Sequence, residues 1–265
     1  MPGANFSSAR LDKADLSGGV EAQGANFLMA SLQGVDLTGA QLLGADFSHA
    51  DLIGAVMSFA VLDLAMLKDA KLDGAVLYRA SLIGADVSGA STVGTDLREA
   101  KVWRTVPPSA DPNGLADFTG VAIARMTDAD AAEIKARLER VQSRRVRARL
   151  QEKAAALVDP GEAARWTSTA DHRQWQGLAS VGTRWDAEIY RQSITEYLVQ
   201  LFCRPRWSNG AVATGVARRA QRQEFRGDLA QVYTRLKAAS CPASETVAPK
   251  VLRDLSTAAD VAHGG

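Results

Sequence analysis

The sequence has few of the residues from which enzyme sites and large cores are usually built. Aromatic residues make up only 6% of its 265 residues, so an aromatic-rich core is not expected and the many alanines must supply the packing. No Gly-rich phosphate loop, His-Glu-X-X-His motif or Cys-X-X-Cys motif occurs in the chain. We therefore expect no catalytic site, no metal, no cofactor and no small-molecule substrate.

Long apolar runs are also missing. No stretch approaches the roughly 18 residues that a membrane-spanning helix needs, and the first residues lack the basic and apolar segments of a secretory signal. The formal net charge of +1 argues against a protein that is basic or acidic as a whole. These absences predict a cytoplasmic protein that does not insert into a membrane, unless the chain is a fragment of a longer one.

What the sequence has instead is a five-residue repeat. Within Gly44–Ala90 an alanine returns at almost every fifth position, and a large apolar residue follows two positions later. The large residues keep this spacing over 22–102 and, one residue out of phase, over 6–16. The phase slips at Gly18-Gly19, where glycine can absorb an extra residue.

A period of five suits neither a helix nor a strand. A helix would scatter these residues around its surface, and a strand would send successive ones to opposite faces. A coil with four sides resolves both problems, because each five-residue unit forms one side and turns a corner with its small and large residues pointing inward. One coil then takes about 20 residues and pairs its backbone with the next coil about 4.8 Å away.

The repeat resembles that of a known family. Ala45-Asp46-Phe47 and Ala50-Asp51-Leu52 match the Ala-(Asp/Asn)-Leu-X-X consensus of pentapeptide repeat proteins, and the resemblance covers about 4–104. It implies a right-handed quadrilateral β-helix, which is a mainly β solenoid. Because Ala116-Asp117-Phe118 resumes the pattern, we expect this β-helix over 4–125, with a loop excursion at about 105–115.

The rest of the chain predicts helices. A capping helix is expected over 127–158, where Thr127-Asp128 can cap its start and where it would cover the open C-terminal end of the β-helix. A C-terminal α-helical domain is expected over 159–262, with helices at about 183–203, 211–221, 223–239 and 249–261. This region resembles the helical tails of some larger bacterial pentapeptide repeat proteins.

Two cysteines, Cys203 and Cys241, fall at the ends of two predicted helices. If the helices alternate in direction, both thiols lie at the same end of the domain, within reach of a disulfide bond. A bridge would indicate the periplasm or the cell envelope, whereas free thiols would indicate a reduced cytoplasm. The sequence leaves both alternatives open.

Apolar residues also occupy positions that should face outward on the predicted coils. They are Val56, Phe59, Val61, Leu64, Met66, Val76 and Tyr78. An apolar patch of this kind marks an interface. Either the chain's own helices dock on it, or it binds a protein partner or a second copy of the chain.

Three functions are compatible with these features. The first is a non-enzymatic protein–protein interaction or scaffold module. The second, implied by the family resemblance, is a DNA mimic that binds or inhibits DNA gyrase, although residues 1–105 hold 12 acidic and 8 basic residues, a net charge of only −4. The third is an envelope-associated structural protein. Nucleic acid is not expected as a partner, because Glu133, Glu139 and Glu152 interrupt the basic residues of the predicted capping helix.

Overall fold

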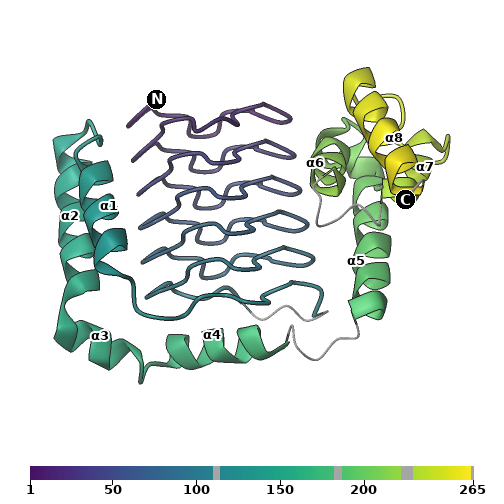
Figure 1. Ribbon diagram of the computed structural model, residues 1–265. Helices are drawn as coiled ribbons and strands as arrows, with labels where there is room; N and C mark the ends of the chain where they lie inside the picture. Colours follow the sequence, from purple (N-terminus) through teal and green to yellow (C-terminus); the bar gives the residue numbers. More distant parts are fainter. Residues whose placement is uncertain (110–113, 182–186, 222–228, 264–265) are drawn as a thin grey trace.

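In the computed structural model, the N-terminal part of the chain winds into a stack of coils, with helices beside and beneath it (Figure 1). The structure describes residues 1–265 except 110–113, 182–186, 222–228 and 264–265. We call residues 1–123 the coil stack. Within the described part of the chain, no helix is both long enough and apolar enough to cross a membrane.

Four columns of parallel backbone bridges join each coil to the next. The columns begin at Asn5, Arg10, Asp15 and Glu21, and we name the four sides of the stack after these residues. Partners in the lower coils lie 20 residues apart, as for Val61 and Ser81. The three columns that start before Gly18-Gly19 are offset by 21 residues at their first step, which confirms the predicted slip in phase.

Each side holds the coils together through a single bridged residue followed by a turn, and the described residues contain no extended strand. Asn26 shows the pattern, since its N–H donates to Ala4 of the preceding coil at 2.9 Å. The next N–H, that of Phe27, donates to Asp46 of the following coil at 2.7 Å. A side of five residues has room for one such bridge before the chain must turn.

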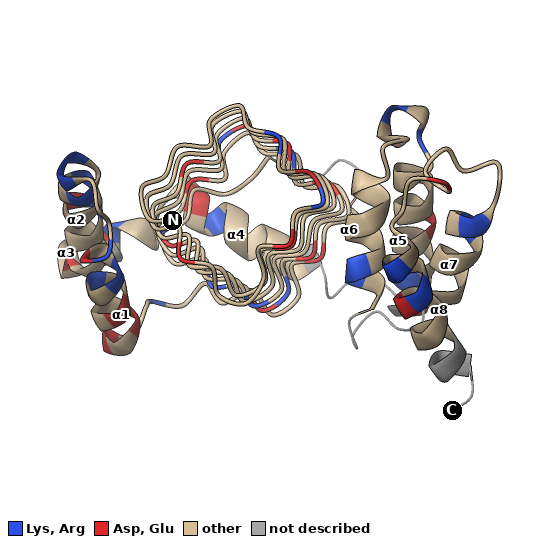
Figure 2. Cartoon of the chain, turned by 90° about the horizontal axis from the view of Figure 1, so that it is seen from above, with Lys and Arg blue, Asp and Glu red and all other residues tan. Residues whose placement is uncertain are grey.

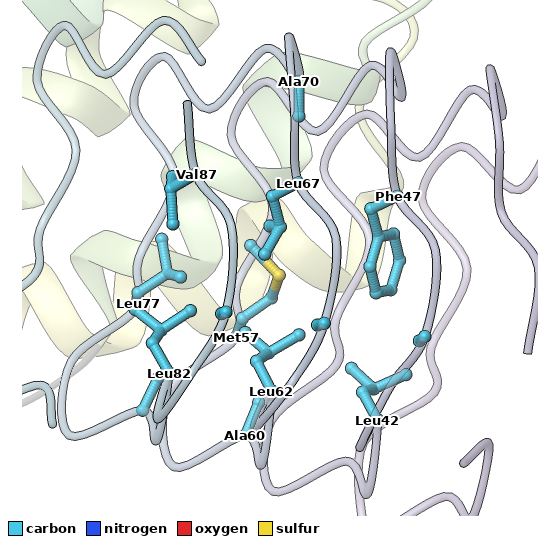
Figure 3. Packing of buried hydrophobic residues seen from close by; sticks show 14 of the residues in the cluster. Leu42, Phe47, Met57, Ala60, Leu62, Leu67, Ala70, Leu77, Leu82 and Val87 are labelled. Carbon is cyan, nitrogen blue, oxygen red and sulfur yellow. The ribbon is translucent and has the colours of Figure 1, made fainter. Parts of the chain in front are cut away.

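The interior is filled by the alanines and the large apolar residues of the repeat. Figure 3 shows large residues of successive coils in two facing rows, with Leu42, Leu62 and Leu82 opposite Phe47, Leu67 and Val87. All of these side chains are at most 3% exposed. Burying each one stabilises the fold by about 1.5–3 kcal/mol, so the repeat supplies a continuous core although aromatic residues are few.

The repeat resumes after its loop, as the sequence predicted. Asp117 bridges to Asp96, and Ala122 bridges to Lys101. Each pair is offset by 21 residues, so the loop adds one residue to the register. Part of the loop, residues 110–113, lies outside the described residues.

The capping helix expected over 127–158 is two helices, and they lie along the stack instead of over its end (Figure 1). α1 (Asp128–Leu138) starts at Thr127, whose hydroxyl accepts a hydrogen bond from the Asp130 N–H. α2 (Arg144–Val158) starts at Ser143. One helix over 127–158 would be about 48 Å long, whereas six coils rise only about 29 Å. Because the chain folds back between α1 and α2, the apolar faces of both helices can contact the coils.

The C-terminal end of the stack is covered by α4 (Ala170–Val181), which α3 (Pro160–Trp166) connects to α2 (Figure 1). Trp175 of α4 is fully buried, and its Nε1 donates to the Thr105 carbonyl at 2.8 Å. Its ring meets that of Phe118 edge-on, with 6.1 Å between centroids. The end is therefore closed by α4, further along the chain than the sequence predicted.

The remaining helices form a group beside the Arg10 side, across the stack from α1 and α2 (Figure 2). They are α5 (Ala187–Phe202), the 3-10 helix η1 (Pro205–Trp207), α6 (Ala211–Ala220), α7 (Leu229–Lys237) and α8 (Pro249–His263). The four α-helices match the segments that the sequence predicted at about 183–203, 211–221, 223–239 and 249–261. Residues 183–186 and 223–228 of those predictions lie outside the described residues.

Helix α6 comes so close to the coils that both surfaces need glycine. A Cβ on Gly34 would lie 2.0 Å from the Ala211 carbonyl oxygen, and a Cβ on Gly215 would lie 2.0 Å from the Gly54 carbonyl oxygen. Arg219, at the end of α6, is 2% exposed and donates to the Gly94 carbonyl at 2.7 Å. The helical group is thus held to the coils by backbone contact and by a buried guanidinium.

Candidate interaction surface

The chain's own helices cover two opposite sides of the coil stack (Figure 2). On the Arg10 side, the turns at Gly34 and Gly54 contact α6, and the turn at Gly74 contacts α5. On the Glu21 side, the turns at Gly44 and Gly84 contact α2. The helical group also buries Val56, Val76 and Asp96, at the edge of the Asp15 side next to the Arg10 side. A partner can reach the coils on the Asn5 side and on the remaining part of the Asp15 side, where Phe59 is exposed.

The predicted apolar patch is divided by this arrangement. Leu64 is 1% exposed and lies beside Leu157 of α2. Val56 and Val76 are fully buried, next to the turns that contact α6 and α5. Val61 is 9% exposed, and Met66 is half-buried on the Asn5 side. The buried members Leu64, Val56 and Val76 are internal packing.

Phe59 and Tyr78 lie at the surface of the Asp15 side. The Phe59 side chain is 47% exposed, and its ring meets the Tyr78 ring edge-on, with 5.7 Å between centroids. Phe59 also has a φ of 59°, a left-handed conformation that costs a residue with a Cβ about 1–2 kcal/mol. The same turn conformation recurs along the coils, as at Arg79 and Glu99. The exposure of a large aromatic side chain is therefore what makes this position a candidate for binding.

Hydrogen bonds and ion pairs fix the charged side chains around this aromatic pair. Arg79 Nε donates to Glu99 at 2.6 Å, and the Tyr78 hydroxyl donates to the same carboxylate at 3.2 Å. Arg98 Nε donates to the buried Asp96 at 2.9 Å. The hydrogen bond from Arg79 lowers the pKa of Glu99, so this carboxylate remains ionised at neutral pH. The guanidinium carbons of Arg79 and Arg98 lie 5.1 and 5.5 Å from the Tyr78 ring centroid.

We define the Asp15-side surface as Phe59, Tyr78, Arg79, Arg98 and Glu99. The sequence singled out its aromatic members but not its charged ones. A signal was available, because Arg79 and Glu99 follow Phe59 at intervals of 20 residues and Arg98 follows Tyr78 at the same interval. Bridged partners on this side lie 20 residues apart, so these residues fall in line on successive coils.

A cavity of about 200 Å³ adjoins this surface, between the coils and α1. Phe59, Arg79, Lys101, Asp130 and Arg137 contribute to its lining. Lys101 Nζ donates to Asp130 of α1 at 2.6 Å, so an ion pair ties the helix to the coils at its edge.

Asp63 is the buried carboxylate of this cavity. It is 1% exposed and accepts hydrogen bonds from the Ser81 hydroxyl and from the Ile83 N–H. Burial raises the pKa of Asp63 to about 6, although these bonds and Arg137, 3.9 Å away, favour the charged form. The described residues include no group of His, Cys, Asp or Glu side chains suited to hold a metal ion.

Cys203 and Cys241 form a disulfide in the structure, with their Cα atoms 4.8 Å apart. The bond links the end of α5 to the segment between α7 and α8, 38 residues further on. It lies in the helical group, away from the Asp15-side surface.

A family model described as pentapeptide repeats matches the chain at residues 3–39, 30–69, 40–78 and 62–98. No curated protein matches the chain. A pentapeptide repeat protein from the Arabidopsis thaliana thylakoid lumen is 28% identical, over 50% of this chain and 72% of its own, with a TM-score of 0.30. One from Nostoc is 36% identical, over 35% of this chain and 69% of its own, also with a TM-score of 0.30.

A third similar structure is HetL from Nostoc sp. strain PCC 7120, a pentapeptide repeat protein involved in heterocyst differentiation regulation. It is 28% identical, over 45% of this chain and 70% of its own, with a TM-score of 0.23. With TM-scores this low, the three structures add no argument about what this chain binds.

Proposed function

Because the chain belongs to the pentapeptide repeat family through its N-terminal part, we propose that its coils form a right-handed quadrilateral β-helix that serves as a non-enzymatic protein–protein interaction or scaffold module. The observation that carries the proposal is the Asp15-side surface, where an exposed Phe59 lies among charged side chains that are fixed by hydrogen bonds. Arginine and large aromatic residues contribute much of the binding energy at protein interfaces.

The order of this surface supports a docking role. Ion pairs and ring contacts already fix Tyr78, Arg79, Arg98 and Glu99 before any partner arrives. Immobilising a long side chain on binding costs about 0.5–1.5 kcal/mol, and here most of that cost is met during folding. The coils beneath are joined at regular intervals by backbone bridges and form a rigid base.

The charges of the uncovered sides do not favour the DNA-mimic alternative. A protein that replaces DNA should present a continuous negative surface, because DNA carries one negative charge per about 1.7 Å of its axis. On the uncovered sides, Lys68, Arg79 and Arg98 are interspersed with Asp46 and Asp86. The surface is therefore of mixed sign.

The disulfide favours a second candidate function, an envelope-associated structural protein. A bond between Cys203 and Cys241 would persist in an oxidising compartment and would be reduced in most cytoplasms. Alkylation of free thiols during lysis of the source cells tests this candidate. Two alkylated cysteines per chain would remove it and favour a cytoplasmic scaffold.

The docking proposal is tested with two glycine substitutions at matched positions. Phe59→Gly removes the central ring from the Asp15 side, and Met29→Gly removes a 58% exposed side chain with a φ of 57° from the Asn5 side. Relief of left-handed strain, about 1–2 kcal/mol, opposes the loss of packing and the greater freedom that glycine gives the unfolded chain. Urea unfolding of both variants checks that they remain folded, and loss of binding is assigned to the surface only when they do.

The readout is the set of proteins that co-purify with each variant from source-cell lysate, quantified by mass spectrometry. We expect at least one partner to be reduced tenfold or more with Phe59→Gly and unchanged with Met29→Gly. Identical sets for the wild type and both variants would refute docking on the Asp15-side surface.

A further inference from the structure

A groove separates α1 from α2 where the two helices run side by side along the coils (Figure 1). Its volume is about 470 Å³, and small-molecule sites commonly hold about 300–1,000 Å³. The groove shares no lining residue with the cavity of Asp63 or with the Asp15-side surface. It is therefore a separate candidate for binding.

The groove exists because each of the two helices is anchored to the coils by its own residues. Ile134 and Leu138 of α1 are buried in the core, and Leu150 and Leu157 of α2 lie against turns of the coils. Between these anchors, the groove is lined on both helices by alanines, which are Ala131, Ala132, Ala154 and Ala155. Alanine leaves a space that larger side chains would fill.

The lining is apolar at one end of the groove and polar toward the other. The chain turns back after α1, so the start of α1 lies beside the end of α2 (Figure 1). Met126 and Val158 line this end, and the Val158 side chain is 45% exposed. Lys135, Glu139 and Gln151 line the part of the groove nearer the turn.

Lys135 supplies the charge that this groove offers to a ligand. Glu139 also lines the groove, but its carboxylate lies 3.8 Å from the Arg147 guanidinium in an ion pair. Lys135 is exposed and forms no ion pair within the described chain. A positive charge therefore remains at the polar end.

We propose that the groove binds a single-chain amphiphile with an anionic head group, of the fatty-acid class. The ligand carboxylate pairs with Lys135 and accepts a hydrogen bond from the Gln151 amide, and the chain lies along the alanines toward Val158. An apolar site with a few polar groups that fix the orientation of the ligand is typical of small-molecule binding. The polar and apolar ends of the groove match the two ends of such a molecule.

The length of the groove predicts the length of the chain. Gln151 and Val158 are seven residues apart on α2, which corresponds to about 10 Å along the helix axis. An extended chain advances about 1.2 Å per bond, so about eight to ten carbons fill the groove. Further carbons would extend beyond Val158 into solvent.

The test is calorimetric titration of the whole chain with hexanoate, octanoate, decanoate and dodecanoate, each below its micelle-forming concentration. We expect one bound molecule per chain. Because burying a CH₂ group is favourable, affinity should increase up to about fourfold for each added CH₂. The increase should stop near decanoate, where the groove is full.

Three variants assign the binding to this groove. Ala155→Leu fills it and should weaken octanoate at least tenfold, whereas Ala148→Leu adds the same side chain at an exposed position of α2 outside the groove and should change nothing. Lys135→Gln should weaken octanoate about two- to fivefold, the usual range for an exposed ion pair. It should leave the affinity for octan-1-ol, which carries no charge, unchanged.

Several outcomes would overturn the proposal. They are the absence of saturable binding, an affinity that still rises at the same rate from decanoate to dodecanoate, and equal binding by Ala155→Leu and the wild type. Vesicles of phosphatidylcholine and phosphatidylglycerol distinguish a free ligand from a membrane. If the wild type sediments with vesicles and binds no free fatty acid, the groove contacts a membrane and the proposal is wrong. None of these measurements involves Phe59, so the groove and the Asp15-side surface are tested separately.

Discussion

Asp63 is the residue at which we expect pH to act on the stability of the fold. Its folded-state pKa of about 6 lies above the ordinary value of 3.8 because burial disfavours the charged carboxylate. Between these two values the folded chain holds a proton that the unfolded chain has lost. The free energy of unfolding therefore decreases as the pH rises from about 4 to about 6.

The prediction is that Asp63→Asn removes this pH dependence. The shift of about 2 units corresponds to roughly 3 kcal/mol, so the wild type should lose up to that amount relative to Asp63→Asn between pH 4 and pH 7. Urea unfolding of both proteins across this range measures the difference.

Asp73→Asn is the control for this experiment. Asp73 accepts the same two kinds of hydrogen bond, from the Ser91 hydroxyl and the Val93 N–H, at a position that is only partly buried. If Asp63→Asn and the wild type respond equally to pH, the buried carboxylate is not the source of the effect.

Among the elements, the coils were the part that the sequence predicted best. The spacing from Leu42 to Leu62 to Leu82 defines which residues face inward, and the double glycine at Gly18-Gly19 marks the change of register. These are local rules that each five-residue unit repeats. The helix periodicity likewise located α5 and α7, whose buried residues recur at intervals of three and four, as at Leu229, Val232 and Leu236. Helix α6 is buried on almost all sides and shows no such interval.

The docking of the helices could not be predicted in the same way. Ser143 is a local signal for a new helix, because its side chain accepts a hydrogen bond from the Val146 N–H. A serine alone does not predict that the chain turns back, and the turn becomes favourable because Val141 is fully buried against the coils. The same contacts decide that Leu64 is covered while Phe59 is not, since α2 reaches one side of the stack and not the next. Long-range packing determines both results.

The contact between α6 and the coils leads to a prediction with a matched control. Gly34→Ala would place a Cβ 2.0 Å from the Ala211 carbonyl oxygen and must displace α6. Gly39→Ala meets the same left-handed backbone, with a φ of 69° against 62°, but its nearest atom outside its chain neighbours is 4.0 Å away. We expect Gly39→Ala to cost about 1–2 kcal/mol of unfolding free energy and Gly34→Ala to cost clearly more.

Hydrogen exchange distinguishes strain from displacement in these variants. Amide protection in α6 should fall with Gly34→Ala and persist with Gly39→Ala. If the two variants lose equal stability and keep equal amide protection in α6, the helix moves away from Gly34 at no energetic cost. The close approach at Gly34 then does not hold α6 in place.

At the scale of the whole molecule, the coil stack behaves as an array in which each coil contacts only its neighbours. In such arrays stability is approximately a sum of coil and interface contributions, so the ends govern fraying. Here α4 protects one end, and the side helices α2, α5 and α6 tie several coils together. In the described structure, a helix therefore caps the C-terminal end of the stack.

The closed end can be opened by Trp175→Ala, which removes a fully buried ring and its hydrogen bond to the Thr105 carbonyl. Truncating a buried tryptophan costs about 3–5 kcal/mol. Because the loss lies at one end of an array, hydrogen exchange should accelerate first in the last coils, around Leu97, and least in the second coil, around Leu32. Trp207→Ala, at a buried tryptophan of the helical group, controls for the general loss of a ring. Uniform acceleration from Leu32 to Leu97 would mean that the side helices couple all coils into one unit, and that α4 contributes to stability without acting as a cap.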